Sequence, residues 1–143
     1  MHSGGNMDRH IARKEAVCLL FDAGFNPEKS VEQILADAAA ARDLEADEYI
    51  SAVLNGVMKY KEQIDAVISA HLKGWAIGRL SKIVLAILRL AVFEIDYRPD
   101  IPDGVSVNEA VELAKKYGEP KDASFINGLL GSYLREKGEK AGD

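Results

Sequence analysis

A short basic cluster near the start of the chain contains the first residues that could do chemistry: Arg9, His10, Arg13 and Lys14. In a helix Arg13 lies one turn beyond Arg9, and such cations can follow a phosphate backbone and release its counterions. The formal net charge of −5 argues against a general nucleic-acid binder, although residues 73–98 hold five Lys or Arg against two Asp or Glu. The cluster is therefore either a cationic patch on an acidic body or an ordinary solvated helix face.

The residue types that serve catalysis or metal binding are scattered. The three histidines stand at positions 2, 10 and 71, and none has a cysteine or carboxylate at metal-ligand spacing. Cys18 lies among apolar residues, which favours a buried inert thiol over a nucleophile. No glycine-rich phosphate loop is present. We therefore expect no catalytic residue, no metal site and no cofactor.

Length and composition indicate one globular domain. The 143 residues suffice for a hydrophobic core, and a single cysteine excludes an internal disulfide. The first seven residues lack the apolar stretch of a signal peptide. The most apolar run, 83–95, contains Arg89 and Glu94 and is too short to span a bilayer. These features predict a cytoplasmic protein without membrane contact.

Helical periodicity recurs throughout, and no strand-like alternation of useful length occurs. The predicted helices cover residues 8–23, 30–42, 46–72, 79–97, 106–118 and 122–137. The third is long, with a bend near Gly56 or Tyr60 left open, and the fourth is apolar around most of its circumference, as in a central helix. Ser30 and Ser106 each begin a capping-box pattern.

The predicted fold is all-α: a compact bundle of six to seven helices with short connections. Residues 8–137 form the single domain. Residues 1–7 form a flexible leader, either native or left from expression, and residues 138–143 form a polar, frayed tail.

Three segments together resemble the NusB family over roughly residues 8–137. The first is RHIARKEA from Arg9, with Phe21 a turn later. The second is Arg79-Leu80 followed by AILRLAVFEI from Ala86. The third is VNEAVELAKKYG from Val107, followed by FINGLLG from Phe125. The last two segments stand in the family's order and at its spacing.

The resemblance implies a fold of two packed helical subdomains and a role in transcription. Family members bind the boxA element of nascent ribosomal-operon RNA as a heterodimer with NusE, a small-subunit ribosomal protein. The complex helps RNA polymerase to read through terminators. The expected partners are thus single-stranded boxA RNA, NusE and the RNA polymerase antitermination complex.

Matching positions extend the candidate RNA-binding set to Arg89, Lys121, Phe125 and Asn127. Each position has a structural alternative. Arg89 could pack its stem and extend its head to the rim, Phe125 could be core, and Asn127 with Gly128 could mark a close helix–helix contact. Asn108 and Glu109 are attributed to helix capping.

Several positions depart from the family pattern. His10 and Ile11 interrupt a stretch that is richer in arginine in many relatives, and Ser124 stands where a cation is common. Val84-Leu85 replaces an acidic–basic pair, and Phe21 replaces a common tyrosine. Phe21, Val84 and Leu85 are the candidate partner-binding residues, and their apolar character leaves a homodimer open as an alternative to NusE.

Two other functions stay open. The first is a helical protein-interaction module, homodimeric in one form, with weak or lost RNA binding. The second is the accessory domain of an RNA cytosine methyltransferase, which the lack of a catalytic region in this chain disfavours. A shared fold does not decide between such functions.

Overall fold

The computed structural model describes residues 8–42 and 47–142, and in this part of the chain every regular element is helical. The elements are α1 (Arg9–Phe25), α2 (Val31–Arg42), α3 (Glu48–Lys59), α4 (Lys61–Ala70), the 3-10 turn η1 (Ile77–Arg79), α5 (Lys82–Tyr97), α6 (Asp103–Tyr117) and α7 (Pro120–Gly142). The predicted all-α bundle is confirmed.

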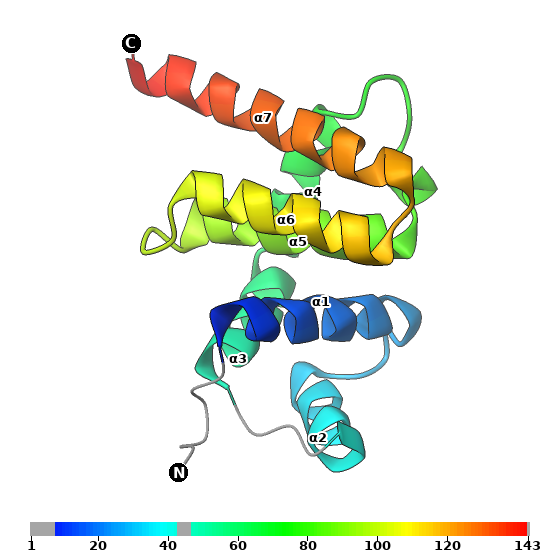
Figure 1. Ribbon diagram of the computed structural model, residues 1–143. Helices are drawn as coiled ribbons and strands as arrows, with labels where there is room; N and C mark the ends of the chain where they lie inside the picture. Colours follow the sequence, from blue (N-terminus) through cyan, green and yellow to red (C-terminus); the bar gives the residue numbers. More distant parts are fainter. Residues whose placement is uncertain (1–7, 43–46, 143) are drawn as a thin grey trace.

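The helices form two packed groups, with α1, α2 and α3 in one and α4 to α7 in the other (Figure 1). Helix α5 joins the groups because it packs against α1 and α3 on one side and against α4, α6 and α7 on the other. Ten of its 16 residues are buried, including Ile87 and Leu88. The segment expected to be central is therefore the core of the bundle.

Side-chain oxygens define where several helices begin. The Ser30 hydroxyl accepts a hydrogen bond from the Gln33 amide at 3.1 Å, as predicted, although the Gln33 side chain donates to Asp37. Asp47 caps α3 through the Ile50 amide at 3.0 Å. Such caps stabilise a helix by about 1 kcal/mol each because they satisfy amides without a helical partner.

The predicted capping box at Ser106 is wrong. Helix α6 begins at Asp103, after Pro102 in an extended conformation, so Ser106 lies inside the first turn. The Ser106 hydroxyl donates to the Glu94 carboxylate at 2.7 Å. A tertiary contact uses the hydroxyl that the sequence pattern assigned to a local cap.

The long third helix is divided at Tyr60 into α3 and α4. Tyr60 has φ −105° and ψ 21°. Its ring stacks on Tyr97 with the centroids 4.0 Å apart and the planes 8° from parallel. Gly56 instead allows close packing, because a Cβ at this position would overlap the buried Phe93 ring. The break therefore lies at the stacked tyrosine, and the glycine serves the helix contact.

Two helix ends also differ from the prediction. Helix α1 continues through Gly24 to Phe25. The backbone of α7 is helical from Pro120 to Gly142, beyond the expected end at Lys137. No helix in the described part of the chain is both long enough and apolar enough to cross a membrane.

Replacing Gly56 by alanine tests the packing role of this glycine. We expect Gly56→Ala to lower the free energy of unfolding by about 1–3 kcal/mol, because the added methyl group displaces Phe93. Gly128→Ala is the control, since an added Cβ there meets nothing within 4 Å. This control should raise stability by about 0.5–1 kcal/mol through helix propensity. Urea unfolding measures both, and equal effects of the two variants would refute the interpretation.

Candidate nucleic-acid interface

Arg9 is the exposed cation at the start of α1. Asp8 caps the helix by accepting from the His10 amide at 2.8 Å, which places Arg9 in the first turn. The Arg9 guanidinium carbon lies 4.7 Å from the ring centroid of buried Tyr49. An aromatic face orients a cation without neutralising it. Arg9 is therefore positioned and still able to bind a phosphate.

Arg13, one turn further along α1, is buried. It is 4 % exposed and donates to Glu94 from Nε at 2.8 Å and from Nη2 at 3.2 Å. Burial opposes the charge, yet the hydrogen bond and the charge of Glu94 hold the pKa of Arg13 above its ordinary value. Arg13 thus binds an internal carboxylate. The sequence suggested that its guanidinium would bind phosphate, but the pair with Glu94 occupies it.

Glu94 receives hydrogen bonds from three helices. Besides Arg13 of α1, the Tyr49 hydroxyl of α3 and the Ser106 hydroxyl of α6 donate to it. Burial, followed by the charge of Glu94, raises the pKa of Tyr49, which keeps the phenol protonated as a donor. The cluster fixes the start of α1, where the basic residues lie, against the core.

An acidic residue lies inside the basic end of α1. The Nδ1 atom of His10, which is 66 % exposed, lies 2.8 Å from Oε1 of Glu109 on α6, and the same oxygen is 3.6 Å from Arg13. Glu109 therefore links α1 to α6. The helix-capping role that the sequence suggested for it is not observed. Lys14 is half-buried, as expected of a lysine whose stem packs while its ammonium group stays hydrated.

Arg89, the candidate on the central helix, forms a bidentate pair with Asp65 of α4. Both hydrogen bonds measure 2.8 Å, and the arginine side chain is 18 % exposed. The geometry agrees with the structural alternative for this residue. Its charge is matched by a neighbouring carboxylate, and its contribution is to hold α4 against α5.

At the other end of the molecule, Phe125 of α7 lies beside Trp75 in the connection before η1. The ring centroids are 5.7 Å apart and the planes are inclined at 44°. Gly74 has a φ of +82°, a conformation that L residues rarely adopt, and it turns the chain directly before Trp75. Trp75 is 41 % exposed, whereas Phe125 is half-buried and also packs against the core.

The other α7 candidates, Lys121 and Asn127, are both exposed. Lys121 and Phe125 line a groove of about 590 Å³ that Trp75 and Tyr117 also border. Asn127 is not among the residues lining this groove, because positions two apart on a helix face different directions. A Cβ at Gly128 would meet nothing within 4 Å, so the alternative of a close helix–helix contact there is wrong.

Helices α1 and α6 lie side by side and run in the same direction (Figure 1). His10 meets Glu109 at one end of this pair, and Cys18 lies beside Tyr117 at the other. Burial raises the pKa of Tyr117, and the neighbouring thiol adds to this shift. The arrangement connects the basic start of α1 with Tyr117 and, through it, with the groove that holds Phe125.

The candidate partner-binding residues do not lie together. Phe21 and Leu85 line a separate groove of about 410 Å³ between the α1–α2 turn, α3 and α5. Three lysines border it as well: Lys29, Lys61 and Lys82. Val84 is only 3 % exposed and packs in the core, so its side chain is not available to a partner.

Trp75, Tyr117 and Tyr49 are the site residues that the sequence reasoning missed. The available signal for Trp75 was the only tryptophan of the sequence standing directly after a glycine, in a connection between two predicted helices. Tyr117 and Tyr49 gave no such signal, since their neighbours come from distant parts of the chain.

Exposed Arg9 at the start of α1, and Lys121 with the Trp75–Phe125 pair at the other end of the molecule, are the kinds of group that single-stranded nucleic acid can use. In the described residues no group of three or more His, Cys, Asp or Glu could hold a metal ion. The fold and this surface define an all-helical protein with a candidate interface for single-stranded nucleic acid.

Comparison with known protein families identifies the family to which this chain belongs. Residues 10–135 match the model of the NusB family, and since this match covers most of the chain, the protein belongs to that family. The transcription antitermination protein NusB of Clostridium botulinum is 43 % identical over 141 residues, which cover 90 % of this chain and 100 % of the relative. The resemblance noted in the sequence is confirmed.

Solved structures agree on the fold. NusB of T. maritima superimposes with a TM-score of 0.81 at 30 % identity, covering 92 % of this chain and 93 % of that one. A complex of the antitermination factors NusB and NusE with dsRNA contains a chain with a TM-score of 0.79 at 24 % identity, covering 91 % and 99 %. At the latter identity the likeness establishes the fold alone.

Substitution at Arg13 tests whether this residue is structural. We expect Arg13→Ala to lower the free energy of unfolding by about 3–5 kcal/mol, because it leaves Glu94 buried without its cation. Arg9→Ala removes an exposed cation–π contact with Tyr49 and should cost no more than about 1 kcal/mol. Chemical denaturation of the two variants measures the difference. An Arg13→Ala variant as stable as the parent protein would contradict the buried-pair assignment.

Proposed function

We propose that this protein is a transcription antitermination factor that binds boxA-type single-stranded RNA as a heterodimer with NusE and promotes read-through by RNA polymerase in ribosomal RNA operons. It acts in the cytoplasm and catalyses no reaction of its own. Membership of the NusB family supports this proposal, as does the name of the Clostridium botulinum relative.

One observation carries the RNA-binding part: exposed cations and accessible aromatic rings occur together on the surface. Arg9 lies at the start of α1, and Lys121 and half-buried Phe125 of α7 line one groove with exposed Trp75. Single-stranded RNA presents both a phosphate backbone and unstacked bases, so it can use both kinds of group. In double-stranded RNA the faces of the bases are stacked on one another, so the aromatic rings would have no base face to contact.

The structure refines which candidate residues contact RNA. Arg9, Lys14 and Lys121 are the proposed phosphate ligands, with His10 beside them as a polar contact. Phe125 is the proposed stacking residue, and Asn127 would reach a base edge from the adjoining face of α7. Arg13 and Arg89, both paired with carboxylates, hold these helices in position instead of contacting RNA.

The groove that contains Phe21 and Leu85 is the proposed contact for NusE. It combines an apolar floor with the lysines Lys29, Lys61 and Lys82 on its border, and protein interfaces commonly place a polar rim around an apolar centre. In the solved complex that shares this fold, NusB is found together with NusE and dsRNA.

A helical interaction module with weak RNA binding, or a homodimer using the same groove, is the second candidate. The observation favouring it is the pairing of Arg13 and Arg89 with Glu94 and Asp65, which removes two cations from the expected RNA-binding set. Size-exclusion chromatography with light scattering distinguishes a homodimer from a monomer that binds RNA.

Fluorescence anisotropy of a boxA-type RNA against a scrambled RNA, with and without NusE, tests the proposal over a salt series. We expect selective binding that NusE strengthens. Arg9→Ala and Lys121→Ala should each reduce the slope of log affinity against log salt by about 0.7, since each removes one phosphate contact to a single strand.

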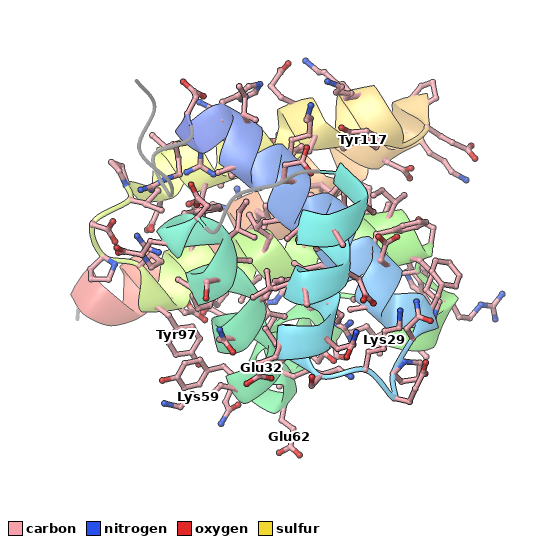
Figure 2. All side chains as sticks on the ribbon, turned by 90° about the horizontal axis from the view of Figure 1, so that it is seen from below. Lys29, Glu32, Lys59, Glu62, Tyr97 and Tyr117 are labelled. Atoms are coloured by element: carbon pink, nitrogen blue, oxygen red, sulfur yellow. The ribbon has the colours of Figure 1, made fainter. Side chains whose placement is uncertain are left out.

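Lys59→Ala is the matched control, because Lys59 is exposed and lies at the edge of the molecule opposite Tyr117 (Figure 2). It should leave both affinity and slope unchanged. Equal binding of both RNAs even with NusE present would reject the antitermination function and favour the interaction module.

A further inference from the structure

Trp75 and Phe125 stand between two grooves that the structure places side by side. The first, of about 590 Å³, also contains Tyr117, Ile83 and Arg79. The second, of about 510 Å³, also contains His71 and Arg135. Both grooves share the two aromatic residues, so the Trp75–Phe125 pair forms a wall between them.

The lining of the first groove offers the groups that an unstacked nucleobase can use. Trp75 and Phe125 close one side and Tyr117 borders it elsewhere, and the floor includes the apolar residues Leu80 and Ile83. An apolar floor between aromatic faces favours a flat, unstacked ring, because every base offers a π-face for stacking. Tyr117 is 36 % exposed and Trp75 41 %, so both rings are accessible from solution.

The border of this groove is polar and carries both signs of charge. Arg79 and Lys121 are exposed cations that could hold the phosphates on either side of an inserted base. The Asp122 carboxylate accepts a hydrogen bond from the Glu119 amide at 2.8 Å, so it stabilises the start of α7. The exposed Glu119 carboxylate remains as an acceptor for an amino group on a base edge.

We propose that Trp75 is a base-stacking residue: together with Phe125 and Tyr117 it encloses one unstacked base of a single-stranded RNA, while Arg79 and Lys121 bind the flanking phosphates. This inference rests on the proposed RNA-binding function and names a site within it. RNA is the expected occupant because two of the proposed RNA-binding residues, Lys121 and Phe125, line this groove. The stacked base and the rigid wall hold the strand in register.

Trp75 is the only tryptophan in the chain, so its fluorescence reports on this site alone. Titration of the full-length protein with boxA-type RNA should quench this emission in parallel with the rise in RNA anisotropy, because a stacked base quenches an indole. A rise in anisotropy with unchanged emission would overturn the Trp75 inference and leave the proposed function standing. No rise in anisotropy at all would reject the proposed function itself.

Affinity gives a second, independent measurement. Trp75→Ala should weaken RNA binding by about 5- to 150-fold, the range for one lost stacking contact, without changing the salt slope. Trp75→Phe should recover most of the affinity. Arg79→Gln should instead reduce the slope by about 0.7. Phe25→Ala, which removes an aromatic ring that is 57 % exposed outside both grooves, should bind as the parent protein does.

Abasic substitution along the RNA locates the base. At one position, removing the base should weaken binding to the parent protein by the same factor as Trp75→Ala weakens binding to intact RNA. Removing that base should not weaken binding to Trp75→Ala any further. The circular dichroism spectrum of Trp75→Ala should match that of the parent protein, because Trp75 is 41 % exposed. Additive losses at every position, or a Trp75→Ala variant with parental affinity, would overturn the assignment.

Discussion

The buried carboxylate of Glu94 is the interaction on which the joint between the two helical groups depends. It accepts four hydrogen bonds, two from Arg13, one from Tyr49 and one from Ser106. Arg13 and Tyr49 belong to the group of α1 and α3, and Ser106 belongs to α6. A fully buried carboxylate is costly unless it is paired and fully hydrogen-bonded, so the three donors are required together. The orientation of α1 relative to α5 and α6 follows from this requirement.

The same cluster connects the core with the surface. The Tyr49 hydroxyl bonds Glu94, while the Tyr49 ring supports the exposed guanidinium of Arg9. One tyrosine therefore relates the internal charge pair to a cation that faces solvent. The chain has a net charge of −5, and it directs some of its arginines inward to carboxylates, as with Arg13 and Arg89. The candidate nucleic-acid interface consequently has few exposed cations at each end. For RNA binding, the position of these cations matters more than their number.

The sequence predicted the helices, the central position of residues 79–97 and the family, because periodicity and the two long motifs are local signals. The division at Tyr60 and the role of Ser106 were not predictable in this way. Both depend on partners that lie elsewhere in the chain: the Tyr97 ring for the first and the Glu94 carboxylate for the second. Arg13 and its carboxylate are 81 positions apart, so no local pattern separates this buried arginine from Arg9. Trp75 meets Phe125 only because the fold brings the connection before η1 against α7.

The shared direction of α1 and α6 has a consequence for the length of RNA that the protein can hold. Cations lie at one end of this helix pair and aromatic rings beyond the other, with about 12 Å of α1 between His10 and Cys18 at the usual helical rise. If RNA uses the proposed surface, a strand that reaches both ends binds bivalently, since release at one end leaves the other attached and rebinding is intramolecular. A shorter strand engages one end and dissociates from it independently. On the proposed RNA-binding surface, the distance that the packed helices fix between these two ends therefore sets the shortest strand that can bind at both.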